Sequence, residues 1–205
     1  MVHNVNGIAA RLREMYRLSW LTPADIEKAT EYLCHAIDGP VDSLLMVYHG
    51  LVQQYLEAPA SAGHHLAVKG GLLVHSLNVT DRLLKLTGDW GIRWDHPSSP
   101  YVIGMCHDLC KLNAYAFKTD DTEITKLVPM FPGHGTLSAM LAPVFLGHPI
   151  THMEMACIVY HMGAWDLGRD YEAQNLDRAV QEYPLQVIAT HTADMLASQW
   201  DEKGM

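Results

Sequence analysis

The chain has 205 residues, of which 49% are hydrophobic and 18% charged, a composition typical of a folded globular protein. Its formal net charge of −9 and the lack of any basic run argue against nucleic acid as a partner. No segment approaches about eighteen consecutive apolar residues, and the first 17 residues lack the apolar stretch of a secretory signal. We therefore expect a cytoplasmic protein with no membrane partner.

The hydrophobic pattern predicts seven or eight helices in chain order. They cover residues 7–20, 23–37, 42–58, 72–86, 101–113, 135–146, 151–162 and 184–196. Thr22-Pro23-Ala24-Asp25 is typical of a helix start, because Thr can cap the helix and Pro suits its first position. Gly39-Pro40 ends the second helix, Gly70-Gly71 precede the fourth, and Pro184 begins the last.

Two polar segments interrupt this series. Residues 115–130 are rich in Thr, Lys and Asp, which predicts a loop or a short hairpin around Asp120-Asp121. Residues 163–184 are interpreted as a polar loop. With almost no other strand signal, we predict an all-α protein that forms an irregular helical bundle.

The four cysteines are scattered through apolar helical patterns, and a disulfide framework is not expected in a cytosolic chain. Cys106 and Cys110 lie four residues apart on one helix face but lack two further partners for a zinc site. We interpret all four as small core residues.

Histidine and aspartate residues interrupt several of the predicted apolar helices. His107 and Asp108 lie inside the segment YVIGMCHDLCKL, where a buried carboxylate needs a partner and a cation is the usual one. Four more such residues lie in or beside apolar helical stretches: His75, His134, His161 and Asp194. The intervals after Asp108 are 26, 27 and 33 residues, about one helix and loop per step. Successive helices can therefore each offer one ligand to a shared centre.

The order and local sequence of these residues resemble the HD superfamily of metal-dependent phosphohydrolases. GGLLVHSLNV is similar to a segment of HD-type exoribonucleases and of HD domains associated with conjugative relaxases, and HDLCK resembles the family's HD-x-x-K. HTADMLA resembles the closing Asp-bearing helix, while FPGHGTLSAMLA and YHMGAWD resemble stand-alone bacterial and phage HD proteins. The resemblance covers about residues 60–200. We therefore expect an HD domain over residues 61–205, with residues 1–60 as an N-terminal helical extension packed on its core.

The resemblance implies a set of metal ligands. The first divalent ion would be bound by His75, His107, Asp108 and Asp194. His134 and His161 would bind a second ion, with Asp108 bridging the two, or would contact the substrate phosphate in a one-metal site; we favour two ions. Nitrogen and oxygen donors without thiolate suit Mn, Fe, Ni, Co, Zn or Mg, so the identity of the metal stays open.

Three further residues have assignments with alternatives. Lys111 follows Asp108 by three positions and is expected to hold a phosphate oxygen or orient the nucleophilic water, unless it is a surface lysine. His65, with neighbouring His64 as the weaker candidate, is expected to contact the substrate, unless it is a loop residue. His191 lies one turn before Asp194 and is either a partner of a ligand or a hydrogen-bonded core histidine.

The activity implied by the resemblance is hydrolysis of a phosphoester, in a nucleotide or another small phosphorylated metabolite, by a metal-activated hydroxide. Asp108 and Lys111 would be the catalytic residues. The lack of a basic face argues against a processive exoribonuclease, and the sequence has no GYP signature of cyclic-dinucleotide phosphodiesterases. The alternatives are a dinuclear-iron oxygenase of the same fold, similar to myo-inositol oxygenase, and a non-catalytic regulatory module.

Overall fold

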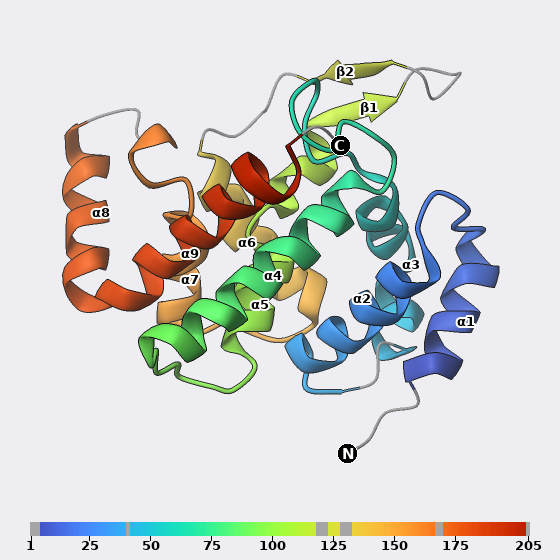
Figure 1. The fold of residues 1–205 in the computed structure, drawn as a ribbon, viewed down its shortest axis with the longest axis horizontal. Coiled ribbons are helices and arrows are strands. Elements are labelled where there is room, and N and C mark those ends of the chain that lie inside the picture. Colours follow the sequence, from blue (N-terminus) through green and yellow to red (C-terminus); the bar gives the residue numbers. More distant parts are fainter. Residues whose placement is uncertain (1–4, 40–41, 118–122, 128–132, 167–169, 204–205) are drawn as a thin grey trace.

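The computed structural model describes residues 5–39, 42–117, 123–127, 133–166 and 170–203 (Figure 1). These residues form nine α-helices and one small sheet, which confirms the all-α class; the HD type of the bundle stays a prediction. The helices are α1 Val5–Tyr16, α2 Pro23–Ala36, α3 Asp42–Glu57, α4 Gly71–Trp90, α5 Ser99–Cys106, α6 His134–Leu146, α7 His152–Val159, α8 Asp170–Glu182 and α9 Pro184–Leu196. Short 3-10 segments cover Leu109–Asn113 and Gly163–Asp166, and a π-helical turn, Ala197–Asp201, continues α9. No helix in the described part of the chain has the length and apolarity needed to cross a membrane.

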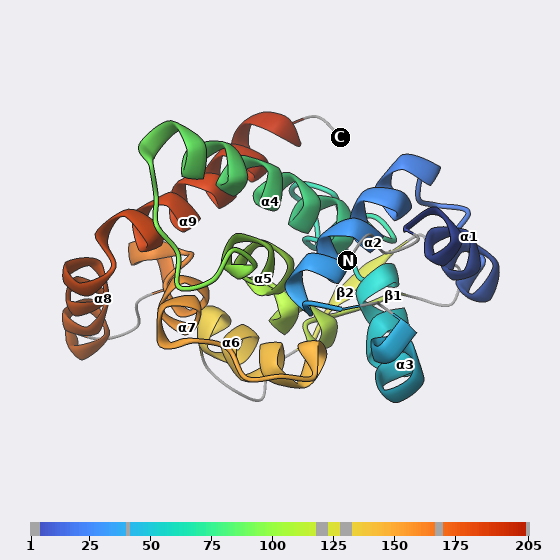
Figure 2. The same ribbon diagram turned by 90° about the horizontal axis from the view of Figure 1, so that it is seen from below.

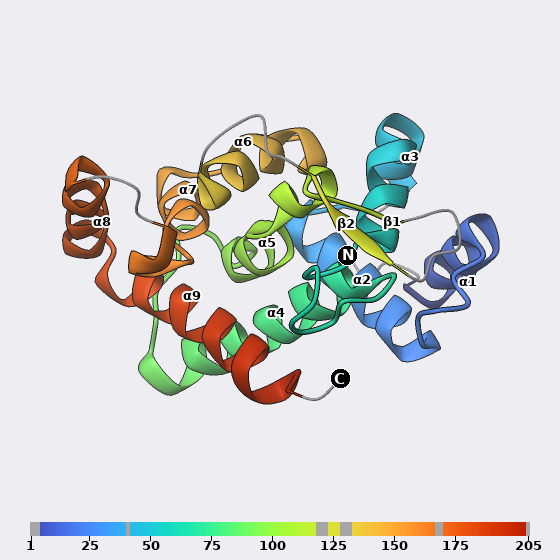
Figure 3. The same ribbon diagram turned by 90° about the horizontal axis from the view of Figure 1, so that it is seen from above.

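Helix α5 lies at the centre of the bundle. Figures 2 and 3 show it enclosed by α4, α9, α7 and α6, with α2 and α3 beyond one end. Its residues from Val102 to Cys106 are all buried, which agrees with a helix that is apolar on every side. The chain segment after α5, which carries His107 and Asp108, therefore lies deep in the protein.

The N-terminal helices contribute to the same hydrophobic core as the rest of the chain, and buried residues of this core extend from Ile8 to Ala197. Tyr55 Oη donates a hydrogen bond of 2.9 Å to the carbonyl of Met105 in α5. Tyr32 hydrogen-bonds to Asp81 in α4, and Lys28 Nζ lies 2.7 Å from the same carboxylate. Helices α2 and α3 thus pack directly on α4 and α5, and α1 packs on α2, while a domain boundary at residue 60 stays a prediction.

Local sequence signals explain where several helices begin. The Thr22 hydroxyl accepts a hydrogen bond from the Asp25 amide, as predicted for a capping Thr, and the Asp25 carboxylate accepts one from the Thr22 amide. Thr151 and Glu154 form the same reciprocal pair at α7. Before α4, Gly70 has a φ of 79°, and a Cβ on Gly71 would lie 2.0 Å from the Leu66 carbonyl oxygen. Both glycines are therefore required to place α4 and the His75 that it carries.

The prediction of one continuous helix over residues 101–113 is wrong. Helix α5 ends at Cys106, Asp108 has φ −114° and ψ 20°, and a 3-10 segment follows. Adjacent side chains of a regular helix point about 100° apart. Leaving the helical conformation at this position lets His107 and Asp108 face the same centre.

The polar loop predicted over residues 163–184 is also wrong, because it contains helix α8. Leu176, Ala179, Val180 and Tyr183 follow each other at helical spacing and pack against the core. The surrounding polar residues concealed this narrow apolar face. Helix ends differ as well: α1 ends at Tyr16, before Arg17 at φ 51°, and α4 extends to Trp90.

The short hairpin expected between residues 115 and 130 is present as two antiparallel strands, β1 Tyr115–Phe117 and β2 Ile124–Lys126. Ala116 pairs with Thr125 at the centre of this ladder. The predicted turn at Asp120-Asp121 lies outside the described residues.

Candidate metal centre

Six polar side chains meet where the central helices converge. His75 comes from α4, Asp194 from α9, and His134 is the first residue of α6. His107 and Asp108 directly follow α5, and His161 follows α7. Five of the six residues are buried; the His134 side chain is the exception, with 28% exposed. The structure therefore brings together every residue that the sequence analysis named as a ligand.

One group of donor atoms surrounds a point between α4, α9 and the end of α5. His75 Nε2 lies 3.2 Å from His107 Nε2, 3.2 Å from Asp194 Oδ1 and 3.5 Å from Asp108 Oδ2. His107 Nε2 lies 3.6 Å from Asp108 Oδ2. Ligands about 2.0–2.2 Å from one ion at tetrahedral or octahedral angles are separated by about 2.8–3.6 Å. The separations among His75, His107 and Asp108 fall in this range, and Asp194 joins the group through its contact with His75.

A second group uses the other oxygen of the same aspartate. Asp108 Oδ1 lies 2.6 Å from His134 Nε2 and 3.5 Å from His161 Nε2. The two carboxylate oxygens of Asp108 therefore face two separate sets of histidines. Both sets, His75–His107–Asp108 and Asp108–His134–His161, are close enough to hold an ion.

The other ring nitrogen of three histidines is held by an oxygen acceptor. Nδ1 of His107 lies 2.9 Å from the Gly104 carbonyl oxygen, and Nδ1 of His161 lies 2.7 Å from that of Ile158. Nδ1 of His75 lies 3.0 Å from Glu202 Oε1. A carbonyl oxygen only accepts, so Nδ1 of His107 and of His161 carries the proton, and Nε2 of each directs its lone pair at the centre. His161 Nε2 is buried and makes no hydrogen bond with any described residue.

The two histidines of the first group have pKa values that are shifted in opposite directions. Burial, together with His161 and His75, lowers the pKa of His107 to about 4, so this imidazole is neutral at pH 7. Burial alone would lower the pKa of His75, but Asp194 and Glu202 raise it to about 9. His75 can thus retain a second proton at neutral pH. A metal ion would replace that proton, because a ligating nitrogen must be deprotonated.

The carboxylates of the centre remain ionised in spite of burial. Burial raises the pKa of Asp108, but Lys111, His107 and His134 hold it well below its ordinary value. Burial likewise raises the pKa of Asp194, but the hydrogen bond and charge of His75 outweigh this effect and hold the pKa below its ordinary value. Two ionised carboxylates in a buried site are what a divalent cation requires.

Lys111 is buried, with 7% of its surface exposed, which excludes the alternative of a surface lysine. Its Nζ lies 2.6 Å from Asp108 Oδ2. Burial lowers the pKa of Lys111, but the charge and the hydrogen bond of Asp108, together with Cys110 and Asp194, raise it above its ordinary value. Lys111 is therefore a charged ammonium group beside the carboxylate that faces both sets of histidines.

The remaining predicted residues lie around the centre. The His65 ring is 5.0 Å from the His75 ring, and its buried Nε2 lies 3.8 Å from Glu202 Oε2 without a hydrogen bond. His64 is exposed. Nδ1 of His191 lies 2.7 Å from the carbonyl oxygen of His161, so His191 supports the backbone that carries a candidate ligand.

Two contributors were missed by sequence reasoning. Glu202 is fully buried and contacts His75 from the C-terminal turn, but an acidic residue in the polar segment QWDEK gives no signal of burial. Cys110 Sγ lies 3.2 Å from Nδ1 of His134, whereas Nδ1 of the other three histidines of the centre has an oxygen partner. All four cysteines lie among the described residues; they are buried and form no disulfide, in agreement with their interpretation as core residues.

Comparisons with models of protein families, with curated protein sequences and with solved structures found no significant match. Any function assigned to this centre therefore depends on its geometry and on the resemblance of its motifs.

Proposed function

We propose that this chain is a metal-dependent phosphohydrolase of the HD type that cleaves a phosphoester of a nucleotide or another small phosphorylated metabolite. The observation that carries the proposal is the position of Asp108. Its two oxygens face two sets of imidazoles, and two imidazoles in each set, His75 with His107 and His134 with His161, direct Nε2 at it. Such an arrangement suits a pair of divalent ions bridged by one carboxylate.

In this proposal the first ion is held by His75, His107, Asp108 and Asp194, and the second by Asp108, His134 and His161. The donors are nitrogen and oxygen, which suit Mn, Fe, Co, Ni, Zn or Mg. When bound, such ions lower the pKa of a coordinated water and stabilise the oxygens of an in-line displacement at phosphorus.

The chain's own residues then have distinct tasks. The partly exposed His134 side chain marks the side from which a substrate can reach the centre. Lys111 balances the charge of Asp108 and is close enough to the centre to stabilise a phosphoryl oxygen. His65, on the loop before α4, has a free ring nitrogen near the His75 side of the centre and is the proposed second substrate contact.

The test combines metal analysis with a substrate screen on one sample. Protein purified with Mn²⁺ is assayed against an aryl phosphoester and a set of nucleotides, with EDTA-treated protein as the blank. We expect hydrolysis that EDTA removes and Mn²⁺ restores. Lys111→Ala should retain its metal but turn over about 10²–10³-fold more slowly, because one electrostatic contact to the transition state is lost.

Two results would contradict the proposal, and a third would contradict one residue's role in it. Bound iron with substrate-dependent oxygen consumption and no hydrolysis would favour the dinuclear-iron oxygenase. Tight metal binding with no turnover in the screen would favour a regulatory module. Full activity of Lys111→Ala would remove the catalytic role of Lys111 alone.

A further inference from the structure

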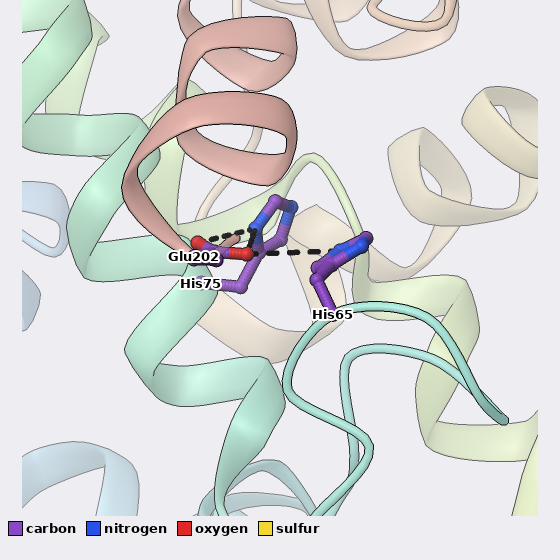
Figure 4. A group of neighbouring side chains, drawn as sticks. All are labelled: His65, His75 and Glu202. Atoms are coloured by element: carbon purple, nitrogen blue, oxygen red, sulfur yellow. Dashed lines mark hydrogen bonds and ion pairs between the residues drawn. The ribbon is translucent and has the colours of Figure 1, made fainter. Parts of the chain in front are cut away.

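Glu202 contacts the centre from outside, through His75. Figure 4 shows its carboxylate beside the His75 ring, with His65 on the neighbouring loop. Oε1 and Oε2 lie 3.0 and 3.1 Å from His75 Nδ1, and Asn78 Nδ2 donates a hydrogen bond of 3.0 Å to Oε1. The carboxylate is 0% exposed.

This burial needs a compensating charge, and the described contacts of Glu202 include no lysine or arginine. An ionised carboxylate removed from water is strongly destabilised unless it is paired. Its closest described partner that can carry charge is the imidazole of His75, whose other nitrogen, Nε2, lies among the proposed metal ligands. Glu202 is therefore coupled electrostatically to whatever cation His75 binds.

The chain places Glu202 by continuing α9. The π-helical turn Ala197–Asp201 follows directly on the helix that carries Asp194, and the Glu202 amide donates to the carbonyl of Ala197 at 3.0 Å. Asp194 and Glu202 thereby contact opposite nitrogens of one imidazole, Nε2 and Nδ1 of His75. The ion pair between Asp201 and Arg82 fastens the same turn to α4. π-Turns of this kind are often found at functional sites.

Donor atoms of His65, His75 and Glu202 lie close enough together to hold an ion of their own. An ion at that position would bind Nδ1 of His75 while the proposed centre uses Nε2, so the ring would have to lose both protons. A hydrogen bond from Nδ1–H to Glu202 satisfies the same contacts without this requirement.

We propose that Glu202 is a positioning residue for the metal centre. It holds His75 in the tautomer that presents Nε2 to the ion, and its negative charge makes that nitrogen a stronger ligand. The inference rests on the proposed metal centre and adds the C-terminal turn to it. It needs no particular substrate or reaction.

The test measures metal affinity in full-length variants, with Mn²⁺ and Co²⁺ as probes. Glu202→Gln keeps the shape and the hydrogen-bond acceptor but removes the charge. We expect a dissociation constant for Mn²⁺ about 10–100-fold larger than in wild type, and an altered visible spectrum of the Co²⁺ form. The metal titration is carried out at alkaline pH, which limits competition between metal binding and protonation of His75. Asp201→Asn is the matched control: it breaks the adjacent ion pair with Arg82 and should leave both readouts close to wild type.

Each other result is decisive. Equal affinity and an unchanged Co²⁺ spectrum in Glu202→Gln would overturn the role of Glu202 and leave the metal centre intact. An equal loss in Asp201→Asn would show that the turn matters only for folding. No binding of either ion by wild type would overturn the metal centre and this inference together. If Glu202→Gln does not fold, Glu202→Asp, which shortens the side chain, should weaken binding; unchanged affinity there would also overturn the proposal.

Discussion

Replacing Lys111 by Met tests whether the centre is built to hold positive charge. In the structure Nζ lies 2.6 Å from Asp108 Oδ2, and both side chains are buried. At an effective dielectric constant of about 20, unit charges at that separation attract each other by about 6 kcal/mol. Part of this attraction is offset by desolvation, and losing one partner of a buried pair typically costs about 3–5 kcal/mol. Lys111→Met should therefore lower the free energy of unfolding in EDTA by about 3–5 kcal/mol.

A bound metal ion should reduce this loss. The ammonium group and the proposed ion neutralise the same carboxylate, so removing the ammonium group should tighten metal binding. Tighter binding of the folded state raises its stability by mass action. With saturating Mn²⁺, the difference between Lys111→Met and wild type should fall to less than half of its value in EDTA.

Urea unfolding followed by circular dichroism, in EDTA and in Mn²⁺, measures both quantities. Lys85→Met is the matched control, because Lys85 forms an exposed pair with Asp89 and its loss should change stability by less than about 0.5 kcal/mol. The reasoning is refuted if Lys111→Met loses less than about 1 kcal/mol in EDTA, or if Mn²⁺ leaves the difference unchanged.

Further predictions concern individual residues of the centre. Asp108→Ala should lose both ions and all hydrolysis, as measured by metal analysis and phosphate release. His161→Ala should retain one of two Mn²⁺ ions in equilibrium dialysis. Gly104→Ala should lower the free energy of unfolding in urea by about 2–3 kcal/mol, because its Cβ would lie 2.2 Å from Thr80 Oγ1 where α4 and α5 cross. In EDTA, the stability that His75 contributes by gaining a proton is present below its ordinary pKa, about 6.5, and is lost as the pH rises through about 9, a change of at most about 3 kcal/mol.

Other outcomes would contradict these four predictions. Activity or bound metal in Asp108→Ala would remove the hydrolase proposal. A single ion in wild type at saturating Mn²⁺ would favour contact of His134 and His161 with the substrate phosphate. Gly88→Ala, whose Cβ meets nothing within 4 Å, is the control for Gly104→Ala, and equal effects would refute the packing argument. If the urea midpoint in EDTA does not decrease when the pH is raised from neutral to about 9.5, the role given to His75 is refuted.

The residues that meet at the candidate metal centre could be predicted from the sequence because they break a strong pattern. Polar residues such as His107 and Asp108 within an apolar helix require partners, and their spacing allows one ligand from each successive helix. Helix starts with chemical signals were also predictable, and Thr22 caps α2 as expected. These are local properties, and local properties are what a single sequence expresses.

The features that were missed depend on tertiary contacts. The break after Cys106 follows from the need to aim two adjacent side chains at one centre, while the residues on either side remain good helix formers. Helix α8 is stabilised by a narrow face around Ala179 that packs on the core. Glu202 is more than a hundred residues from His75 in the sequence, and only the continuation of α9 brings them together.

The most direct test of the account is anomalous X-ray diffraction from crystals soaked in Mn²⁺. The account predicts an ion about 2.0–2.3 Å from His75 Nε2, His107 Nε2 and the carboxylates of Asp108 and Asp194. A second ion is predicted about 3.5–4 Å from the first, on the side of His134 and His161. Anomalous density absent from the space between His75 and Asp108 at saturating Mn²⁺ would contradict the metal centre, and with it the proposed hydrolysis.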